Sequence, residues 1–285
     1  MRYISTEIQS FKQYGNVWEV VKLLKEAGFT AYDASMFTGG LFDEILYADD
    51  WQEKAKQFRA YADGLGIVCN QSHAPFATAR KGNDEYNKAM HPKVVRAIEV
   101  SGILGAKVCV VHPCNDYTAE ENAELYLSFE EAARKAGVKI GVENMWNWAK
   151  GSPTATSAAC SHHDDFKKHL DLLPADVFVA CVDIGHAEMA GLDTSAAQMI
   201  ETLGDRMQSM HLHDVDGVHD NHQVPFTQKV NFAGIVEALK NINYQGDVTL
   251  EVAYGPLKTP KALQEALARY LAAIADYFKN ELDKQ

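Results

Sequence analysis

Hydrophobic and polar residues follow one another along this chain in a repeating order. Short apolar runs rich in β-branched residues precede longer stretches with apolar residues at helical spacing, and this succession occurs eight times without a linker. The short runs predict strands at 3–8, 29–35, 67–73, 107–111, 139–142, 177–183, 209–214 and 247–253. The longer stretches predict helices at 17–25, 51–65, 84–104, 119–136, 164–173, 195–203, 232–239 and 261–278.

This order of elements predicts an α/β fold. Eight strands and eight helices in 285 residues fit a (β/α)8 barrel, or TIM barrel, as a single domain over residues 1–285. The strands of such a barrel are buried on both faces, and they therefore read as continuous apolar runs. The alternative is an open doubly wound sheet, whose usual glycine-rich turn after the first strand is absent here.

Composition limits the partners and the compartment that we expect. The chain has 27 Lys and Arg against 39 Asp and Glu, and its formal net charge of -12 disfavours nucleic acids and anionic membranes as partners. The N-terminal stretch lacks the apolar run of a signal peptide or a membrane span, so we expect a cytoplasmic protein. Of the five cysteines, Cys69, Cys109 and Cys181 lie in strand-like runs, which predicts buried thiols.

Histidines and carboxylates stand near the C-terminal ends of six successive predicted strands. They are His73, His112, Glu143, Asp183, the pair His211 and His213, and Glu251. In a barrel these strand ends converge on one mouth, where active sites of this fold are built. Several buried charges need a compensating group, and a divalent cation is the natural one for this mixture of carboxylates and imidazoles.

The stretch from residue 211 to residue 222 is the densest in metal-type ligands, with four histidines and three aspartates. His211 and His213 lie two apart on a strand and face the same side, so we expect at least one of them to bind the metal ion. His186 follows the sixth strand, and Asp220 and His222 lie on the loop after the seventh. These three residues are candidates for metal or substrate binding, with a solvated loop as the alternative for the last two.

Six short motifs resemble those of the xylose isomerase-like TIM-barrel superfamily. This superfamily includes sugar and sugar-phosphate isomerases and epimerases, inosose dehydratases and isomerases, and endonuclease IV. The motifs are Ser72-His73-Ala74-Pro75, Val111-His112-Pro113, Gly141-Val142-Glu143-Asn144, Val182-Asp183-Ile184-Gly185-His186, His211-Leu212-His213-Asp214 and Leu250-Glu251-Val252. They occur in the right order and cover nearly the whole chain, so together they are specific.

The resemblance implies a set of site residues. Ketose 3-epimerases of this superfamily hold one divalent ion with Glu, Asp, His and Glu from strands five to eight, and the matching residues are Glu143, Asp183, His213 and Glu251. By the same resemblance, Glu143 and Glu251 would be the acid and base and His186 would bind the substrate. We add His73, His112 and Trp146 as expected substrate-binding residues, with plain loop packing as the alternative for Trp146.

Two positions depart from the epimerase pattern. The epimerases carry a second Glu where this chain has Ala149, and an Arg where it has His219. A ketose 3-epimerase in the strict sense is therefore disfavoured.

Endonuclease IV uses a larger ligand set, and this chain matches all of it. The set comprises His73, His112, Glu143, Asp183, His186, His211 or His213, Asp220, His222 and Glu251. His211, Asp220 and His222 are thus candidate ligands of additional metal ions. The net charge of -12 and the lack of a basic stretch make a multi-zinc phosphodiesterase the second choice.

We therefore predict a metal-dependent isomerase or epimerase. It would transfer a proton next to a carbonyl through an enediolate, in a sugar, sugar phosphate or cyclitol, with one bound Mn, Mg, Co or Zn ion and room for more. An inosose-type dehydratase would use the same site, and a sugar-binding barrel without chemistry is a further alternative. The resemblance also favours a homo-oligomer. The sequence does not separate epimerisation, isomerisation and dehydration, because these differ in substrate pose.

Overall fold

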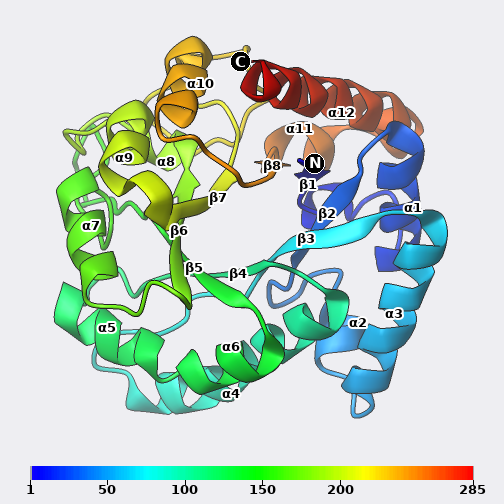
Figure 1. Ribbon diagram of the computed structural model, residues 1–285, viewed down its shortest axis with the longest axis horizontal. Coiled ribbons are helices and arrows are strands. Elements are labelled where there is room, and N and C mark those ends of the chain that lie inside the picture. Colours follow the sequence, from blue (N-terminus) through cyan, green and yellow to red (C-terminus); the bar gives the residue numbers. More distant parts are fainter. Residues whose placement is uncertain (1, 285) are drawn as a thin grey trace.

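Eight parallel strands form a closed ring in the computed structural model, which describes residues 2–284 without the side chain of Tyr254 (Figure 1). One sheet contains β2 (Ala31–Ser35), β3 (Val68–His73), β4 (Val108–Val111), β5 (Lys139–Glu143), β6 (Phe178–Asp183) and β7 (Met207–His211). The strands β1 (Ile4–Thr6) and β8 (Val248–Leu250) pair with each other. Parallel bridges from Glu7 to Asp33 and from Leu212 to Leu250 join this pair to the larger sheet on both sides. The predicted TIM barrel is confirmed.

A ring of helices surrounds the strands (Figure 1). The longer ones are α1 (Val17–Ala27), α3 (Trp51–Leu65), α4 (Asp84–Leu104), α5 (Ala119–Leu127), α6 (Glu130–Ala136), α7 (His163–Asp171), α9 (Ala196–Leu203), α10 (Phe232–Asn241) and α12 (Lys261–Asp283). Short turns add η1 (Gln9–Phe11), α2 (Asp43–Leu46), α8 (Ile184–Ala187), η2 (Gly204–Arg206) and α11 (Tyr254–Lys258).

Local sequence accounts for where these helices begin and end. The Asn16 side chain accepts from the Glu19 amide while Glu19 accepts from the Asn16 amide, and this reciprocal cap starts α1. Gly28 ends α1 with a φ of 111°, which a residue with a side chain rarely adopts. The prediction of a single helix at 119–136 is wrong, because the helix is interrupted between α5 and α6. There the Ser128 hydroxyl donates to the Leu125 carbonyl at 2.6 Å, and Phe129 turns into the core.

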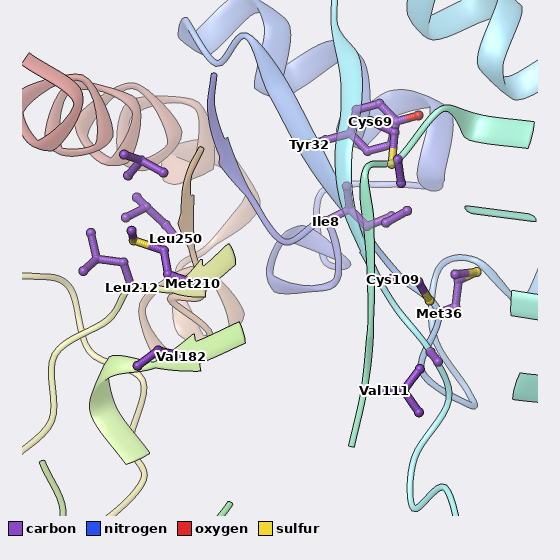
Figure 2. Packing of buried hydrophobic residues seen from close by; sticks show 14 of the residues in the cluster. Ile8, Tyr32, Met36, Cys69, Cys109, Val111, Val182, Met210, Leu212 and Leu250 are labelled. Carbon is purple, nitrogen blue, oxygen red and sulfur yellow. The ribbon is translucent and has the colours of Figure 1, made fainter. Parts of the chain in front are cut away.

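Alternation along the strands separates two apolar layers. In β4, Cys109 and Val111 belong to the large core between the strands and the helices, which Figure 2 shows from close by. Val108 and Val110 instead form a small separate cluster with two β6 residues, Val179 and Cys181. Successive side chains of a strand point to opposite faces, so this second cluster fills the barrel interior. The strands are thus buried on both faces, as the sequence predicted.

All five cysteines are free and buried, which confirms the prediction for Cys69, Cys109 and Cys181. Burial raises the pKa of the thiols of Cys109 and Cys181 to about 11 and that of Cys69 well above its usual value. Within residues 2–284, no helix is both long and apolar enough to cross a lipid bilayer.

Candidate metal centre

Six strands deliver a histidine or carboxylate to the same mouth of the barrel. His73, Glu143, Asp183 and His211 are the last residues of β3, β5, β6 and β7, while His112 and Glu251 directly follow β4 and β8. Five of these side chains are at least nine-tenths buried and His112 is only 12% exposed. The sequence prediction that strand ends bring these residues together is therefore met.

A central cluster forms around one nitrogen of His211. Its Nδ1 atom lies 3.1 Å from Glu143 Oε1, 3.0 Å from Glu251 Oε2 and 3.8 Å from Asp183 Oδ2. One ligand atom from each of these four residues lies within 4.8 Å of the other three. Three carboxylates and one imidazole at such separations match the donors that a divalent cation takes in proteins.

His213 lies behind this cluster rather than in it. Its Nε2 atom is 3.0 Å and 3.1 Å from the two carboxylate oxygens of Asp183, and its ring stacks on His222 with 4.0 Å between centroids. The ring fits because residue 185 is glycine, where a Cβ atom would come within 2.0 Å of the His213 ring. The ligand set that contains His213 stays a prediction, while the geometry favours His211 as ligand and His213 as the partner that orients Asp183.

Two more clusters flank the central one. In the first, His73 Nε2 and His112 Nε2 lie 2.8 Å apart and 3.3 Å and 3.0 Å from Glu143 Oε2. Glu143 thus takes part in this cluster and in the central one. Two imidazole nitrogens that face each other this closely cannot both carry a proton, an arrangement suited to a shared cation.

The second flanking cluster lies nearer to the rim of the mouth. His186 Nε2 is 3.2 Å from Asp220 Oδ2, and His222 Nε2 is 3.0 Å from Asp220 Oδ1. The other nitrogen of each ring meets a backbone carbonyl, that of Asn144 for His186 and that of Glu251 for His222, both at 2.8 Å. These backbone contacts fix the ring orientations and turn each Nε2 atom toward the Asp220 carboxylate, with which it would share a metal ion.

The pKa values of the titratable groups in the mouth depend strongly on neighbouring charges. Burial alone would lower the pKa of His186, but Asp183 and Asp220 raise it to about 10. Burial opposes ionisation of Glu143, yet His211 and His112 hold its pKa well below its usual value. Burial raises the pKa of Glu251 well above its usual value. Protons on histidines therefore provide the positive charge that the carboxylates require.

The donor set fits divalent metal ions. Glu143 Oε2, Glu251 Oε2 and Asp220 Oδ1 are buried and accept no hydrogen bond, although each lies close to a histidine nitrogen. Buried carboxylate oxygens are normally hydrogen-bonded, and lone pairs that instead point into a cluster of nitrogens are ready to bind a cation. Each of the three clusters thus contains a buried carboxylate oxygen that accepts no hydrogen bond.

A cavity of about 840 Å³ lies over the clusters. Its lining contains all four of the expected substrate-binding residues, His73, His112, Trp146 and His186. Trp148 stands edge to face with Trp146 at 6.5 Å between centroids, and such flat apolar surfaces pack well against the faces of sugar rings. The volume is typical of small-molecule sites.

The two positions that depart from the epimerase pattern belong to none of the three clusters, although the His219 ring stacks on Trp148 at 5.9 Å. Ala149 is exposed. The side chain of His219 is 67% exposed and its Nδ1 atom bonds to Asp216 at 2.9 Å. Neither residue lines the cavity.

Several residues of the mouth were missed by the sequence analysis. Phe37 and Phe76 line the cavity, as does the carboxylate of Glu7, which accepts from the hydroxyls of two buried serines. Asp33 lies within 4.8 Å of ligand atoms of His73 and His211, and burial raises its pKa to about 7. Glu7 directly follows β1, so the rule that found the other ligands could have found it, whereas Asp33 lies in the middle of β2.

Comparisons with known proteins agree with this architecture. The model of the xylose isomerase-like TIM-barrel family matches residues 21–274. The uncharacterized protein MJ1311 of Methanocaldococcus jannaschii is 29% identical over 190 residues, 63% of this chain. The match spans 62% of that relative, less than two thirds of its length.

Solved structures share the fold over nearly their whole length. A D-tagatose 3-epimerase-like protein has 21% identity and a TM-score of 0.74, with 99% of this chain and 98% of that one covered. D-psicose 3-epimerase from Clostridium cellulolyticum H10, solved with D-tagatose, has 14% identity and a TM-score of 0.74, with 97% and 99% covered. The IolI protein with a bound zinc atom has 16% identity and a TM-score of 0.74, with 98% of each chain covered. At these identities the likeness concerns the fold.

Proposed function

The chain belongs to the xylose isomerase-like TIM-barrel family, and we propose that it is a divalent-metal-dependent isomerase or epimerase of a sugar or cyclitol. The observation that carries this proposal is the central cluster, in which Glu143, Asp183, His211 and Glu251 bring their ligand atoms within 4.8 Å of one another beneath a cavity of sugar size. The epimerases with this fold and the zinc-bound IolI protein support it.

The four residues of the central cluster would hold one Mn(II), Mg(II), Co(II) or Zn(II) ion. When bound, such an ion polarises a carbonyl and the neighbouring hydroxyl of the substrate and stabilises the negative charge of an enediolate. Glu143 comes from β5 and Glu251 from the end of β8, three strands apart in the ring, so their carboxylates reach the substrate from different sides. One removes the C–H proton and the other returns it.

The residues above the cluster would orient the substrate. His186, His73 and His112 line the cavity and donate or accept hydrogen bonds to hydroxyl groups, while Trp146 offers an apolar face to the ring. Return of the proton to the opposite face epimerises the carbon, and return to the neighbouring carbon isomerises the sugar. Loss of a β-hydroxyl from the same enediolate would make the enzyme a dehydratase.

A second candidate is a multi-metal phosphodiesterase. The observation in its favour is that the two flanking clusters, His73 with His112 and Glu143, and His186 with Asp220 and His222, accompany the central one. Two or three ions at such a site could clamp the oxygens of a phosphodiester. The net charge of -12 weakens this candidate for a polyanionic substrate.

The proposal is tested by exchange of substrate hydrogen with solvent. Purified protein loaded with Mn(II) is incubated in heavy water with D-tagatose, D-fructose, D-psicose and inososes, and deuterium at the carbon next to the carbonyl is followed by NMR. We expect exchange with at least one compound, and Glu251→Gln should abolish it without changing the circular dichroism spectrum.

Binding of a sugar without exchange would instead indicate a barrel without chemistry. Cleavage of abasic DNA by protein that contains about three zinc ions per chain would favour the second candidate.

A further inference from the structure

The C-terminal helix α12 has two different faces. One face packs on α1, α10 and the barrel, and buries Ala268, Leu271, Ala275 and Phe278. Figure 1 shows α12 on the outer ring between α1 and α10, so its opposite face points away from the barrel. A helix that covers a barrel usually presents charged and polar residues on that outer side.

The outer face of α12 carries large apolar side chains instead. Leu263, Tyr270 and Tyr277 recur at seven-residue intervals and are 57%, 54% and 50% exposed. Seven residues are two turns, about 10.5 Å along the axis, so the three side chains form one straight stripe. Phe226 is 54% exposed and lies against the end of this stripe, 5.6 Å from the Tyr277 ring and stacked on Phe278 at 5.2 Å.

Phe226 is held in a fixed position. The buried carboxylate of Asp214 accepts hydrogen bonds from the backbone amides of Thr227 and Gln228, at 3.0 Å and 2.8 Å. The loop that carries Phe226 is thus tied to the segment that directly follows β7. An exposed aromatic side chain on a tethered loop loses little conformational entropy when a partner covers it.

Small residues alternate with the large ones along the stripe. Ala266 and Ala273 are exposed and stand three residues after Leu263 and Tyr270, which gives the alternating three-and-four spacing of a helix that pairs with another helix. In an antiparallel pair of two such helices, Tyr270 of each copy packs over Ala273 of the other, and Tyr277 packs over Ala266. Both tyrosines then meet small side chains across the contact.

The charges beside the stripe are self-complementary. Arg269 and Asp276 are exposed, seven residues apart and on the same flank, so an antiparallel two-fold arrangement brings Arg269 of each copy toward Asp276 of the other. Arg269 and Asp276 also line a pocket between this flank of α12 and the barrel, together with Arg2 and Gly28. A second copy of the chain presents the complementary order of charges by symmetry, whereas a different protein would need a matching order of its own.

We propose that α12 is the interface of a homodimer, in which it pairs antiparallel with α12 of a second copy and buries Leu263, Tyr270, Tyr277 and Phe226. Phe226 lies on the loop that follows β7, which also contains Asp220 and His222, so dimerisation would restrain one wall of the metal centre. This interface does not depend on which reaction the enzyme performs.

Charge reversal tests the proposal on the whole chain. Wild-type protein should sediment as a dimer at micromolar concentration. Arg269→Glu and Asp276→Arg should each raise the dimer dissociation constant at least about tenfold, because each creates two like-charge contacts per dimer. An equimolar mixture of the two variants should dimerise again, since every contact then joins opposite charges. Lys56→Glu on the exposed face of α3 serves as the matched control.

The outcomes separate the proposal from its competitors. Restoration by mixing supports an antiparallel contact of α12 with itself, and circular dichroism verifies that each variant is folded. A wild-type monomer at about 100 μM would overturn the proposal and leave the face to a different protein. A dimer that neither reversal weakens would overturn it as well, because its interface would lie elsewhere.

Discussion

The two ends of the barrel both enclose polar groups in a cavity, about 840 Å³ at the C-terminal mouth and about 700 Å³ at the opposite end. At the opposite end, Lys107 Nζ lies 3.2 Å from Asp247 Oδ2, and Lys139 Nζ donates to Gln208 Oε1 at 2.8 Å. Fixed cations of the chain thus pair with the local oxygen atoms. The polar groups of this end are therefore balanced by other side chains of the protein.

The carboxylates of the central cluster have no such pairing. Within residues 2–284, the groups that face Glu143, Asp183 and Glu251 at ion-pair distance are histidines, and no lysine or arginine is among them. Histidine can give up its proton to a metal ion, whereas lysine and arginine keep theirs at neutral pH. The identity of the compensating cation, more than the presence of buried charge, therefore marks a site built to accept a metal.

The largest effect should follow from removing the carboxylate that two clusters share. We expect Glu143→Gln to lose the bound divalent ion and to lower any turnover at least about 100-fold, because an amide is a poor ligand and a poor base. Metal analysis by mass spectrometry and a turnover assay measure both effects. Asp247→Asn at the opposite end is the matched control and should retain the metal. Equal metal loss in Asp247→Asn would mean that metal binding does not distinguish the two ends of the barrel.

Substitution of His211 should weaken metal binding more than substitution of His213. His211→Asn should abolish binding at the central cluster, while His213→Asn should weaken metal affinity by about 10–100-fold, because His213 acts through Asp183. Titration with Co(II), followed by its visible absorption, gives both affinities. If His213→Asn is the more damaging change, the ligand set with His213 that the family resemblance implies is correct.

Stability should depend on pH in opposite ways with and without metal. The pKa of His186 is about 10 in the folded chain, above its unfolded value of about 6.5. The stabilisation by its proton is therefore complete below about pH 6.5 and is lost as the pH rises toward 10, so the chelated protein should melt at lower temperature as the pH rises.

Added Mn(II) should reverse this trend. Each displaced proton makes metal affinity rise about tenfold per pH unit, and at 100 times the dissociation constant the ion should raise the melting temperature by about 5 °C or more. Thermal melts in EDTA and in Mn(II) between pH 6.5 and 9.5 give the two curves. Parallel curves would mean that the ion does not compete with the histidine protons.

The smallest effect belongs to the opposite end. Lys107→Gln should change the free energy of unfolding by less than about 1 kcal/mol, because the Lys107 side chain is 61% exposed and water screens its ion pair with Asp247. Asp247 keeps hydrogen bonds from the Tyr3 amide and the Asn70 carboxamide. Urea denaturation measures the change, and metal content should be unaltered. A loss of several kcal/mol would show that this ion pair is not a screened surface contact.

The sequence predicted the barrel and the convergence of six strand ends because both depend on local pattern. Strand periodicity also predicted that His211 and His213 share a face, and both rings do approach the Asp183 carboxylate, although β7 ends at His211. Which ring joins the central cluster depends on Gly185, which comes from the neighbouring strand end and leaves space for His213.

The remaining site residues depend on contacts that no single segment contains. The carboxylate of Glu7 enters the cavity while hydrogen-bonded to Ser10 and to Ser35, which stands 28 residues away in the chain. The break near Ser128 was missed for a similar reason, because the burial of Phe129 in the tertiary structure overrides the helical pattern of the segment.

The reactivity of the buried thiols can report the opening of individual strands of the barrel. Cys69, Cys109 and Cys181 lie in β3, β4 and β6, and their raised pKa values and burial leave them almost unreactive while the ring is closed. Labelling of each thiol therefore measures how often its own strand opens. An ion held by residues of β5, β6, β7 and β8 ties that half of the ring together, so it should slow labelling at Cys181 more than at Cys69.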